Sequence, residues 1–262
     1  MSPDWISYDS SARTHDRLGV PAMFAGPAKD LAARLDPAHA GATLDVGAGS
    51  GVVASAMAAC PVVIAADPSL EMLRLARGNG VAAVVAAGLP HLPFPDARFD
   101  RVTAGFVLSH VPSYEAALQD MLRVLRPGGK LGVTSWSKLD NQFVDYWDGL
   151  VDEVIDRDAL RAAMAQWVPW EDWLADRGRL REALVAAGLH EVAVEEIEYP
   201  IHMTSADFLA IREASGTSRF LRTVMNADEF DAFCARAREK FVARFRHPLD
   251  FSRRALIGIG TR

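Results

Sequence analysis

Leu44-Asp45-Val46-Gly47-Ala48-Gly49-Ser50-Gly51 joins an apolar run to a loop that is rich in glycine. The apolar residues 42–46 predict a short buried strand, and residues 52–60 predict a helix of small side chains. Glycines at such a turn let a ligand approach backbone N–H groups at a helix N-terminus. Taken alone, the segment is also compatible with a plain strand–helix turn.

Asp67 ends the next apolar run, residues 62–66, and stands 20 positions after Gly47. A carboxylate at that strand end can accept hydrogen bonds from the hydroxyls of a ribose. The structural alternative is a capping role, since Asp is a good cap for the helix predicted over residues 69–77. The spacing from the glycine loop favours a nucleoside ligand.

Strands and helices alternate outward from this loop. Further strands are predicted at residues 81–86, 99–107 and 130–136, and a helix with an apolar stripe is predicted after Ser113. Continuous apolar strands separated by helices are typical of a parallel sheet covered on both faces. We therefore predict an α/β fold: a Rossmann-like, doubly wound sheet of seven strands, mostly parallel with an antiparallel last strand, plus a helical cap.

The pattern divides the chain into four parts. Residues 1–40 predict an N-terminal helical segment, with breaks at Gly19-Val20-Pro21 and Gly26-Pro27, and residues 41–136 form the alternating core. Residues 137–187 predict a helical lid. Residues 188–262 predict late strands with a helical cap insert at 205–247 between them.

Composition excludes several classes of protein. The 262 residues are 50% hydrophobic and 24% charged, which is typical of a globular protein and excludes disorder over most of the chain. A net charge of −6 gives no general basis for binding nucleic acid. Cys60 and Cys234 cannot form a disulfide framework, so a cytoplasmic location is expected. Glycines and Pro61 interrupt the uncharged stretch 46–66, so we expect a soluble chain with no membrane span.

The loop distinguishes two kinds of cofactor. The dinucleotide fingerprint Gly-x-Gly-x-x-Gly needs a glycine where Val52 stands, and the third glycine is instead Gly51. Asp45 places a carboxylate at the strand end, which would repel a pyrophosphate and would suit a ligand that carries an ammonium group. An NAD-dependent oxidoreductase is therefore the less favoured alternative.

Residues 41–136 resemble a class I S-adenosylmethionine-dependent methyltransferase, of the small-molecule subfamily that is similar to ubiquinone and menaquinone C-methyltransferases. The motifs that carry the resemblance are LDVGAGSG at 44–51, LPFPD at 92–96 followed by Phe99-Asp100, and LRPGG at 125–129. They stand in the family's order and at its spacings. The resemblance implies S-adenosyl-L-methionine as the cofactor, with the helical segment 1–40 covering it.

The resemblance also implies roles for the matching positions. The glycines pass beneath the methionine part of the cofactor, Asp45 orders the loop and reaches toward the amino group, and Asp67 binds the ribose hydroxyls. Pro68 and Met72 border the adenine. Where the family often has Asp, this chain has Gly88, so the adenine must be held by the Leu89 backbone, by water or by apolar contacts.

Two pairs near the N-terminus, Tyr8-Asp9 and His15-Asp16, resemble two aromatic–Asp pairs of the family, with His15 in the place of the usual Tyr. Tyr8 and His15 could equally be helix-packing residues. The predicted cofactor-binding residues are Tyr8, Asp45, Gly47, Ala48, Gly49, Gly51, Asp67, Pro68, Met72, Gly88, Leu89, Phe106, Leu108 and Ser109.

His110 is the candidate general base. It follows the fourth predicted strand, in a segment that resembles the family stretch between cofactor and acceptor. An imidazole titrates near neutrality, as a base must, although a packing role is the alternative. A base is needed only if the nucleophile must lose a proton. The main contribution of such a protein is to align acceptor, methyl group and sulfur.

Aromatic residues gather outside the predicted core. Five of the six tryptophans lie between residues 136 and 173. They could line an apolar acceptor cleft under the lid, or they could pack the lid on the sheet. The predicted acceptor-binding residues are Trp136, Tyr146, Trp147, Trp170 and His202.

These patterns predict an enzyme that transfers a methyl group to a small apolar or aromatic acceptor, at O, N or C. The alternative is a non-methylating homologue that binds the same cofactor and serves as a cyclase or an auxiliary protein. We expect no nucleic-acid partner and no membrane partner, and the scattered histidines predict no metal site. The sequence leaves the acceptor and the oligomeric state open, a homodimer included.

Overall fold

The computed structural model describes residues 6–138, 141–246 and 248–262. The first five residues of the predicted N-terminal segment, residues 139–140 of the predicted lid and His247 at the end of the predicted insert lie outside the described residues. In the described ranges, no helix combines the length and the hydropathy of a membrane span.

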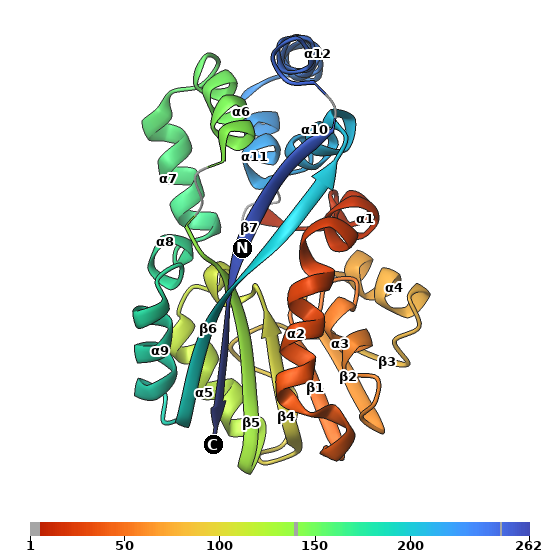
Figure 1. Ribbon diagram of the computed structural model, residues 1–262, viewed down its shortest axis with the longest axis vertical. Coiled ribbons are helices and arrows are strands. Elements are labelled where there is room, and N and C mark those ends of the chain that lie inside the picture. Colours follow the sequence, from red (N-terminus) through yellow and green to blue (C-terminus); the bar gives the residue numbers. More distant parts are fainter. Residues whose placement is uncertain (1–5, 139–140, 247) are drawn as a thin grey trace.

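A seven-stranded sheet in the order β3-β2-β1-β4-β5-β7-β6 forms the body of the molecule (Figure 1). Its strands are β1 (Ala42–Val46), β2 (Val62–Asp67), β3 (Ala83–Ala86), β4 (Phe99–Gly105), β5 (Leu125–Trp136), β6 (His190–Met203) and β7 (Leu249–Thr261). The first five strands pair in parallel, and β7 pairs antiparallel with both β5 and β6. The predicted fold, mostly parallel with an antiparallel last strand, is confirmed.

Helices cover both faces of this sheet. On one face, α2 (Ala25–Leu35) and α3 (Val52–Ala56) share an apolar cluster with β7. On the other, α5 (Tyr114–Val124), α8 (Glu171–Leu174) and α9 (Arg177–Ala186) pack on the buried side chains of β1, β4 and β5. The alternation of apolar strands and amphipathic helices in the sequence therefore builds a three-layered core.

The N-terminal helical segment runs through both predicted breaks. The helix α1 (Ala12–Thr14), the π-helix η2 (His15–Phe24) and α2 follow one another directly. Pro21 lies inside η2, where a π-helical turn changes the hydrogen-bond pattern. Pro27 is the third residue of α2, which continues η2 without a gap, so the helical segment passes through this proline as well. The two predicted breaks were wrong because a helix tolerates proline at both places.

The strands β6 and β7 extend beyond the sheet as a two-stranded arm that reaches the cap (Figure 1). The pairing of β5 with β7 stops at Trp136 and Ala255, whereas β6 and β7 stay paired as far as Met203 and Leu249. The cap consists of α6 (Gln142–Asp152), α7 (Arg157–Trp167), α10 (Ser205–Glu213), α11 (Gly216–Val224) and α12 (Ala227–Arg244). Most of its apolar residues form a cluster separate from those of the sheet. The helices α6 and α7 of the predicted lid therefore share an apolar core with the predicted insert, whereas α8 and α9 of the predicted lid pack on the sheet.

Candidate active site

The glycine loop lies at the carboxyl edge of the sheet, between β1 and α3. Gly47, Gly49 and Gly51 have φ values of 61°, 55° and 89°, a backbone region that favours glycine. A Cβ on Gly47 would meet Val107 at 2.4 Å, whereas a Cβ on Gly49 would meet nothing closer than the sulfur of Met72 at 4.0 Å. Gly47 thus allows close packing, and Gly49 keeps the space above the loop open.

Asp45 lies beneath the loop and is fully buried. Its Oδ2 accepts the N–H of Ala54 in α3 at 2.9 Å, and its Oδ1 accepts the hydroxyl of Thr103 in β4 at 2.7 Å. Burial raises the pKa of Asp45 to about 7, against the opposite effect of these two hydrogen bonds. The side chain therefore ties β1, α3 and β4 together below the loop.

Asp67 stands at the end of β2 and holds the loop from the other side. Its Oδ2 accepts the N–H of Gly49 at 2.9 Å, and its Oδ1 accepts the N–H of Ser69 at 2.8 Å. Ser69 caps the following helix, α4 (Leu70–Gly78), by accepting the N–H of Met72. Burial raises the pKa of Asp67, and the two backbone hydrogen bonds oppose that shift. One carboxylate thus joins the glycine loop to the end of β2.

The N-terminal segment is anchored on α4. Asp9 accepts the hydroxyl of Ser69, and Asp16 accepts the side-chain amide of Asn79 at 2.9 Å. The same amide nitrogen donates to the carbonyl of Ser50 in the glycine loop at 3.0 Å. The acidic members of the two aromatic–Asp pairs therefore hold the segment next to the glycine loop.

Gly88 and Leu89 follow β3 at the same edge of the sheet. A Cβ on Gly88 would meet Pro68 at 3.6 Å, which is an ordinary contact. Leu89 is half-buried against the main apolar core. The pair therefore borders the same strand ends as Asp67, with Pro68 between them and α4.

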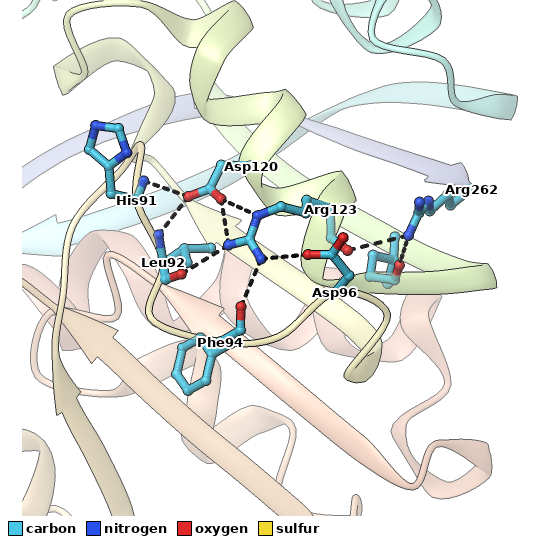
Figure 2. A network of polar contacts seen from close by, with 8 residues as sticks. His91, Leu92, Phe94, Asp96, Asp120, Arg123 and Arg262 are labelled. Carbon is cyan, nitrogen blue, oxygen red and sulfur yellow. Dashed lines mark hydrogen bonds and ion pairs between the residues drawn. The ribbon is translucent and has the colours of Figure 1, made fainter.

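The rest of the loop after β3 is clamped by α5, as Figure 2 shows. Asp120 accepts the N–H groups of His91 and Leu92 at 2.6 and 2.7 Å. Arg123 pairs with Asp120 at 2.8 Å and with Asp96 at 2.9 Å. The LPFPD motif is therefore held by a charge network, which fixes the loop that borders the site.

Aromatic rings cover the ends of β4 and β5. Phe106, which follows β4 with a φ of 60°, stacks on Trp136 with ring centroids 4.2 Å apart. Phe24 of η2 packs edge-on against both rings, at 5.2 and 5.5 Å. Leu108 of η4 (Leu108–His110) is buried in the main core, while Ser109 is half-buried. The rings of Phe24, Phe106 and Trp136 therefore form an apolar cluster beside the glycine loop, which we call the aromatic floor.

His110 lies where the N-terminal segment and the cap meet. Its Nε2 is 3.2 Å from the hydroxyl of Tyr8, and the ring of Trp167 lies 5.4 Å away. Burial lowers the pKa of His110 to about 4, so the imidazole is neutral at pH 7. Arg219 of α11 stacks over both Tyr8 and Trp167, at 4.8 and 5.1 Å. Burial also lowers the pKa of His15 to about 4.

The structure does not bring the predicted acceptor-binding residues together. Only Trp136 lies on the aromatic floor. Trp147 is fully buried in the cap against Phe233, and Tyr146 packs there on Phe241 and Phe245. Trp170 packs on Tyr114 and donates to the carbonyl of Pro112 at 3.3 Å, and His202 is exposed and paired with Asp250 at 2.6 Å. The aromatic enrichment of this region supplies two separate cores, which composition alone does not distinguish.

Several residues at the site were not assigned to it from the sequence. Phe24 and Arg219 come from elements far from the motifs, and Arg253 of β7 lies 3.8 Å over the ring of Trp136. Only Trp167 carried a signal, as a member of the tryptophan-rich region. Among the described residues, no group of three or more His, Cys, Asp or Glu side chains could hold a metal ion.

Comparison with known proteins identifies the family. Residues 44–133 match the family described as "Methyltransferase domain". A demethylmenaquinone methyltransferase of Corynebacterium urealyticum is 41% identical over 105 residues, which cover 40% of this chain and 45% of that protein. The chain thus spans less than half the length of this relative.

A longer match is to a ubiquinone/menaquinone biosynthesis C-methyltransferase of Cupriavidus metallidurans, with 32% identity over 167 residues, 60% of this chain and 68% of that protein. Phosphoethanolamine N-methyltransferase 2 of Haemonchus contortus shares the fold, with a TM-score of 0.58, 15% identity and coverage of 99% of this chain and 60% of that one. Family match, relatives and fold agree: the chain belongs to the class I S-adenosylmethionine-dependent methyltransferases, among the relatives of the ubiquinone/menaquinone C-methyltransferases.

Proposed function

We propose that the protein transfers a methyl group from S-adenosylmethionine to a small apolar or aromatic acceptor. The observation that carries this proposal is the hydrogen bond from the N–H of Gly49 to the carboxylate of Asp67, 2.9 Å long, at the carboxyl edge of the sheet. The loop backbone is open there, because a Cβ on Gly49 would meet nothing closer than 4.0 Å. A carboxylate beside exposed glycine backbone suits a ligand with ribose hydroxyls and an amino acid group.

The residues at this edge fit the cofactor. In this proposal Asp67 receives the ribose, Gly47 to Gly49 lie under the methionine part, and Asp45 acts from below by fixing the loop, since it is fully buried. Pro68, Met72, Gly88 and Leu89 border the adenine. The remaining residues that we assign to the cofactor site, as contacts or as support, are Tyr8, Ala48, Gly51, Phe106, Leu108 and Ser109.

When bound, S-adenosylmethionine supplies a methyl group on a positively charged sulfur. The protein orients the acceptor on the floor of Phe106 and Trp136, and such alignment can lower a reaction barrier by about 7–11 kcal/mol. The covering helices η2 and α7 exclude water from the site. His110, hydrogen-bonded to Tyr8, stays the candidate base for a hydroxyl or amine acceptor, although its lowered pKa of about 4 makes it a weaker base than a free imidazole.

We further propose that the acceptor is a small molecule rather than a nucleic acid, which the net charge of −6 supports. Two buried, unpaired cysteines support a cytoplasmic place of action. In this view residues 1–40 cover the cofactor, residues 41–136 bind it, and the cap residues in 137–187 and 205–247 select the acceptor.

The test is a transfer assay with S-adenosylmethionine that carries a deuterated methyl group. Phenols, aromatic amines, quinols and aromatic carboxylates are supplied as acceptors, and mass spectrometry follows the label. We expect a labelled product from the wild type and from Asp231→Asn, an exposed control on α12, and at least about tenfold less from Asp67→Asn. Binding of S-adenosylhomocysteine without transfer to any acceptor would favour the non-methylating alternative.

A further inference from the structure

His110 lies at a junction to which each of the four predicted parts of the chain contributes one residue. The other three are Tyr8 of the N-terminal segment, Trp167 at the end of α7 and Arg219 of α11. The ring centroids of Tyr8 and Trp167 lie 5.6 and 5.4 Å from that of His110. The guanidinium carbon of Arg219 lies 4.8 Å from the ring centroid of Tyr8 and 5.1 Å from that of Trp167. Arg219 therefore contacts both of the rings that contact His110.

Arg219 also holds the main chain at Tyr8. Its Nη1 donates to the hydroxyl of Ser11 at 3.0 Å, and that hydroxyl donates to the carbonyl of Tyr8 at 3.2 Å. The N–H of Ser11 donates to the same carbonyl at 3.1 Å, and Ser11 is only 5% exposed. A single arginine thus fixes the ring of Tyr8 by stacking and its main chain through Ser11.

The start of α11 is shaped to receive Trp167. Gly216 stands three residues before Arg219, which places both residues on the same face of the helix. A Cβ on Gly216 would lie 2.1 Å from the ring of Trp167, so the glycine lets this ring pack directly on the helix. Nη1 of Arg219 also donates to the carbonyl of Ala214 at 3.1 Å, which fixes the guanidinium. Trp167 is therefore held by two residues of α11.

The charge of Arg219 also acts on this junction. Burial lowers the pKa of His110 to about 4; the backbone of Trp167 opposes this shift, and the charge of Arg219 adds to it. Burial raises the pKa of Tyr8, and the charge of Arg219 opposes that shift. At pH 7 the imidazole is therefore neutral and the phenol keeps its proton. The other charged or titratable groups that act on either ring are His15, Asp67 and Glu171.

A second arginine of α11 makes the same kind of contact away from the site. Arg222 is exposed, and its guanidinium carbon lies 3.8 Å from the ring centroid of Phe230, in the core of the cap. That contact joins only α11 and α12. Arg219 is 6% exposed, and a buried guanidinium is costly unless its donors are paired. The place of Arg219 in the fold, rather than the type of contact, links it to His110.

We propose that Arg219 is a positioning residue of the active site: it holds the two rings around His110, so that the imidazole keeps one orientation toward the acceptor. This inference rests on the proposed function, in which His110 is the candidate base. A reacting group must be held by neighbours whose own side chains are fixed, and a misplacement of about 1 Å can lower a rate about 100-fold. A planar guanidinium suits this task, because its face stacks on rings while its edge donates hydrogen bonds.

The experiment observes His110 directly, by NMR of the whole chain with 15N in its histidine rings; a His110→Gln variant assigns the signals. In the wild type we expect one neutral tautomer down to about pH 5, with the proton on Nδ1 because the hydroxyl of Tyr8 donates to Nε2. Arg219→Gln should raise the share of the other tautomer at least about fivefold and should raise the pKa of His110. Arg219→Lys keeps the charge without the planar fork, so it should keep the low pKa but not the single tautomer.

Ser11→Ala is a milder variant that cuts only the link from Arg219 to the main chain of Tyr8, and it should shift the tautomers in the same direction by less. Arg222→Gln is the matched control and should give the wild-type spectrum of His110. The inference is wrong if Arg219→Gln keeps the wild-type tautomer and pKa, or if Arg222→Gln changes them as much. Affinity of the wild type for S-adenosylhomocysteine, measured by calorimetry, tests the proposed function separately, because the NMR signals need no ligand.

Discussion

The cofactor edge of the sheet and the cap reach their functional contacts over very different distances in the sequence. At the edge, the hydrogen bond between Gly49 and Asp67 joins residues 18 positions apart. In the cap, the hydrogen bond between Arg219 and Ser11 joins residues 208 positions apart. A short stretch of sequence therefore builds the first region, whereas the second depends on how separate helices pack. The cofactor site and the acceptor site should therefore respond to different mutations.

The largest expected effect is a loss of stability in the core of the cap that leaves the cofactor edge of the sheet unchanged. Trp147→Ala should lower the free energy of unfolding by about 3–5 kcal/mol, because Trp147 is fully buried and its loss leaves a cavity. Chemical denaturation measures this change. Trp170→Ala, which removes a half-buried ring, should cost less. Affinity for S-adenosylhomocysteine should stay within about twofold; a large fall would show that the two regions are not separable.

A substitution at Gly47 should instead weaken cofactor binding at the carboxyl edge of the sheet. In Gly47→Ala the left-handed backbone costs about 1–3 kcal/mol, and the new Cβ would meet Val107 at 2.4 Å, so the loop must move. We expect affinity for S-adenosylhomocysteine to fall at least about tenfold, measured by calorimetry. The control is Gly128→Ala, with a φ of 76° and no neighbour within 4 Å. Equal losses in both variants would contradict the role of the loop.

The pH dependence of stability tests whether Asp45 is protonated in the folded protein. Its pKa is raised by burial from 3.8 to about 7, so in that window the folded state keeps a proton that the unfolded state releases. The free energy of unfolding should therefore fall as pH rises through this window, by up to about 1.4 kcal/mol per pH unit.

Asp45→Asn should lack this slope. Its amide can donate to Thr103 while its oxygen accepts from Ala54, so the two bonds of Asp45 are retained. Denaturation of both proteins across the window measures the difference. Parallel curves for the wild type and the variant would mean that Asp45 is ionised in the fold throughout.

The smallest expected effect concerns the contact between the two regions. Tyr8→Phe removes the 3.2 Å hydrogen bond to His110 and should cost about 0.5–1.5 kcal/mol of stability. If His110 acts as the base, the rate of methyl transfer should also fall. Tyr146→Phe is the control, since its hydroxyl lies 3.5 Å from the carbonyl of Lys240, away from the site. An equal rate in Tyr8→Phe and wild type would remove Tyr8 from the reaction.

The strands β1 to β4 could be predicted from the sequence because they are short apolar runs bounded by turn residues. The glycine loop and Asp67 could also be predicted, because they lie close together in the sequence and follow neighbouring strands. The passage of the helix through Pro21 and Pro27 could not, since proline is a strong breaker at most other helical positions.

The acceptor side could not be predicted, because its contacts come from distant elements. Trp136 and Trp147 look alike in the sequence, yet one stacks at the strand ends and the other fills the core of the cap. Arg253 and Arg254 are adjacent and identical in type, yet one faces Trp136 and the other pairs with Glu196. Only the register of β7 against β5 and β6 separates them.

The most direct test of the cofactor edge is a calorimetric titration of S-adenosylhomocysteine into the wild type, Asp67→Asn and Asp231→Asn, with NAD as the competing ligand. The account predicts binding to the wild type and to Asp231→Asn, affinity at least about tenfold lower in Asp67→Asn, and weaker binding of NAD. Equal affinity in Asp67→Asn, or a preference for NAD, would contradict the proposed cofactor site.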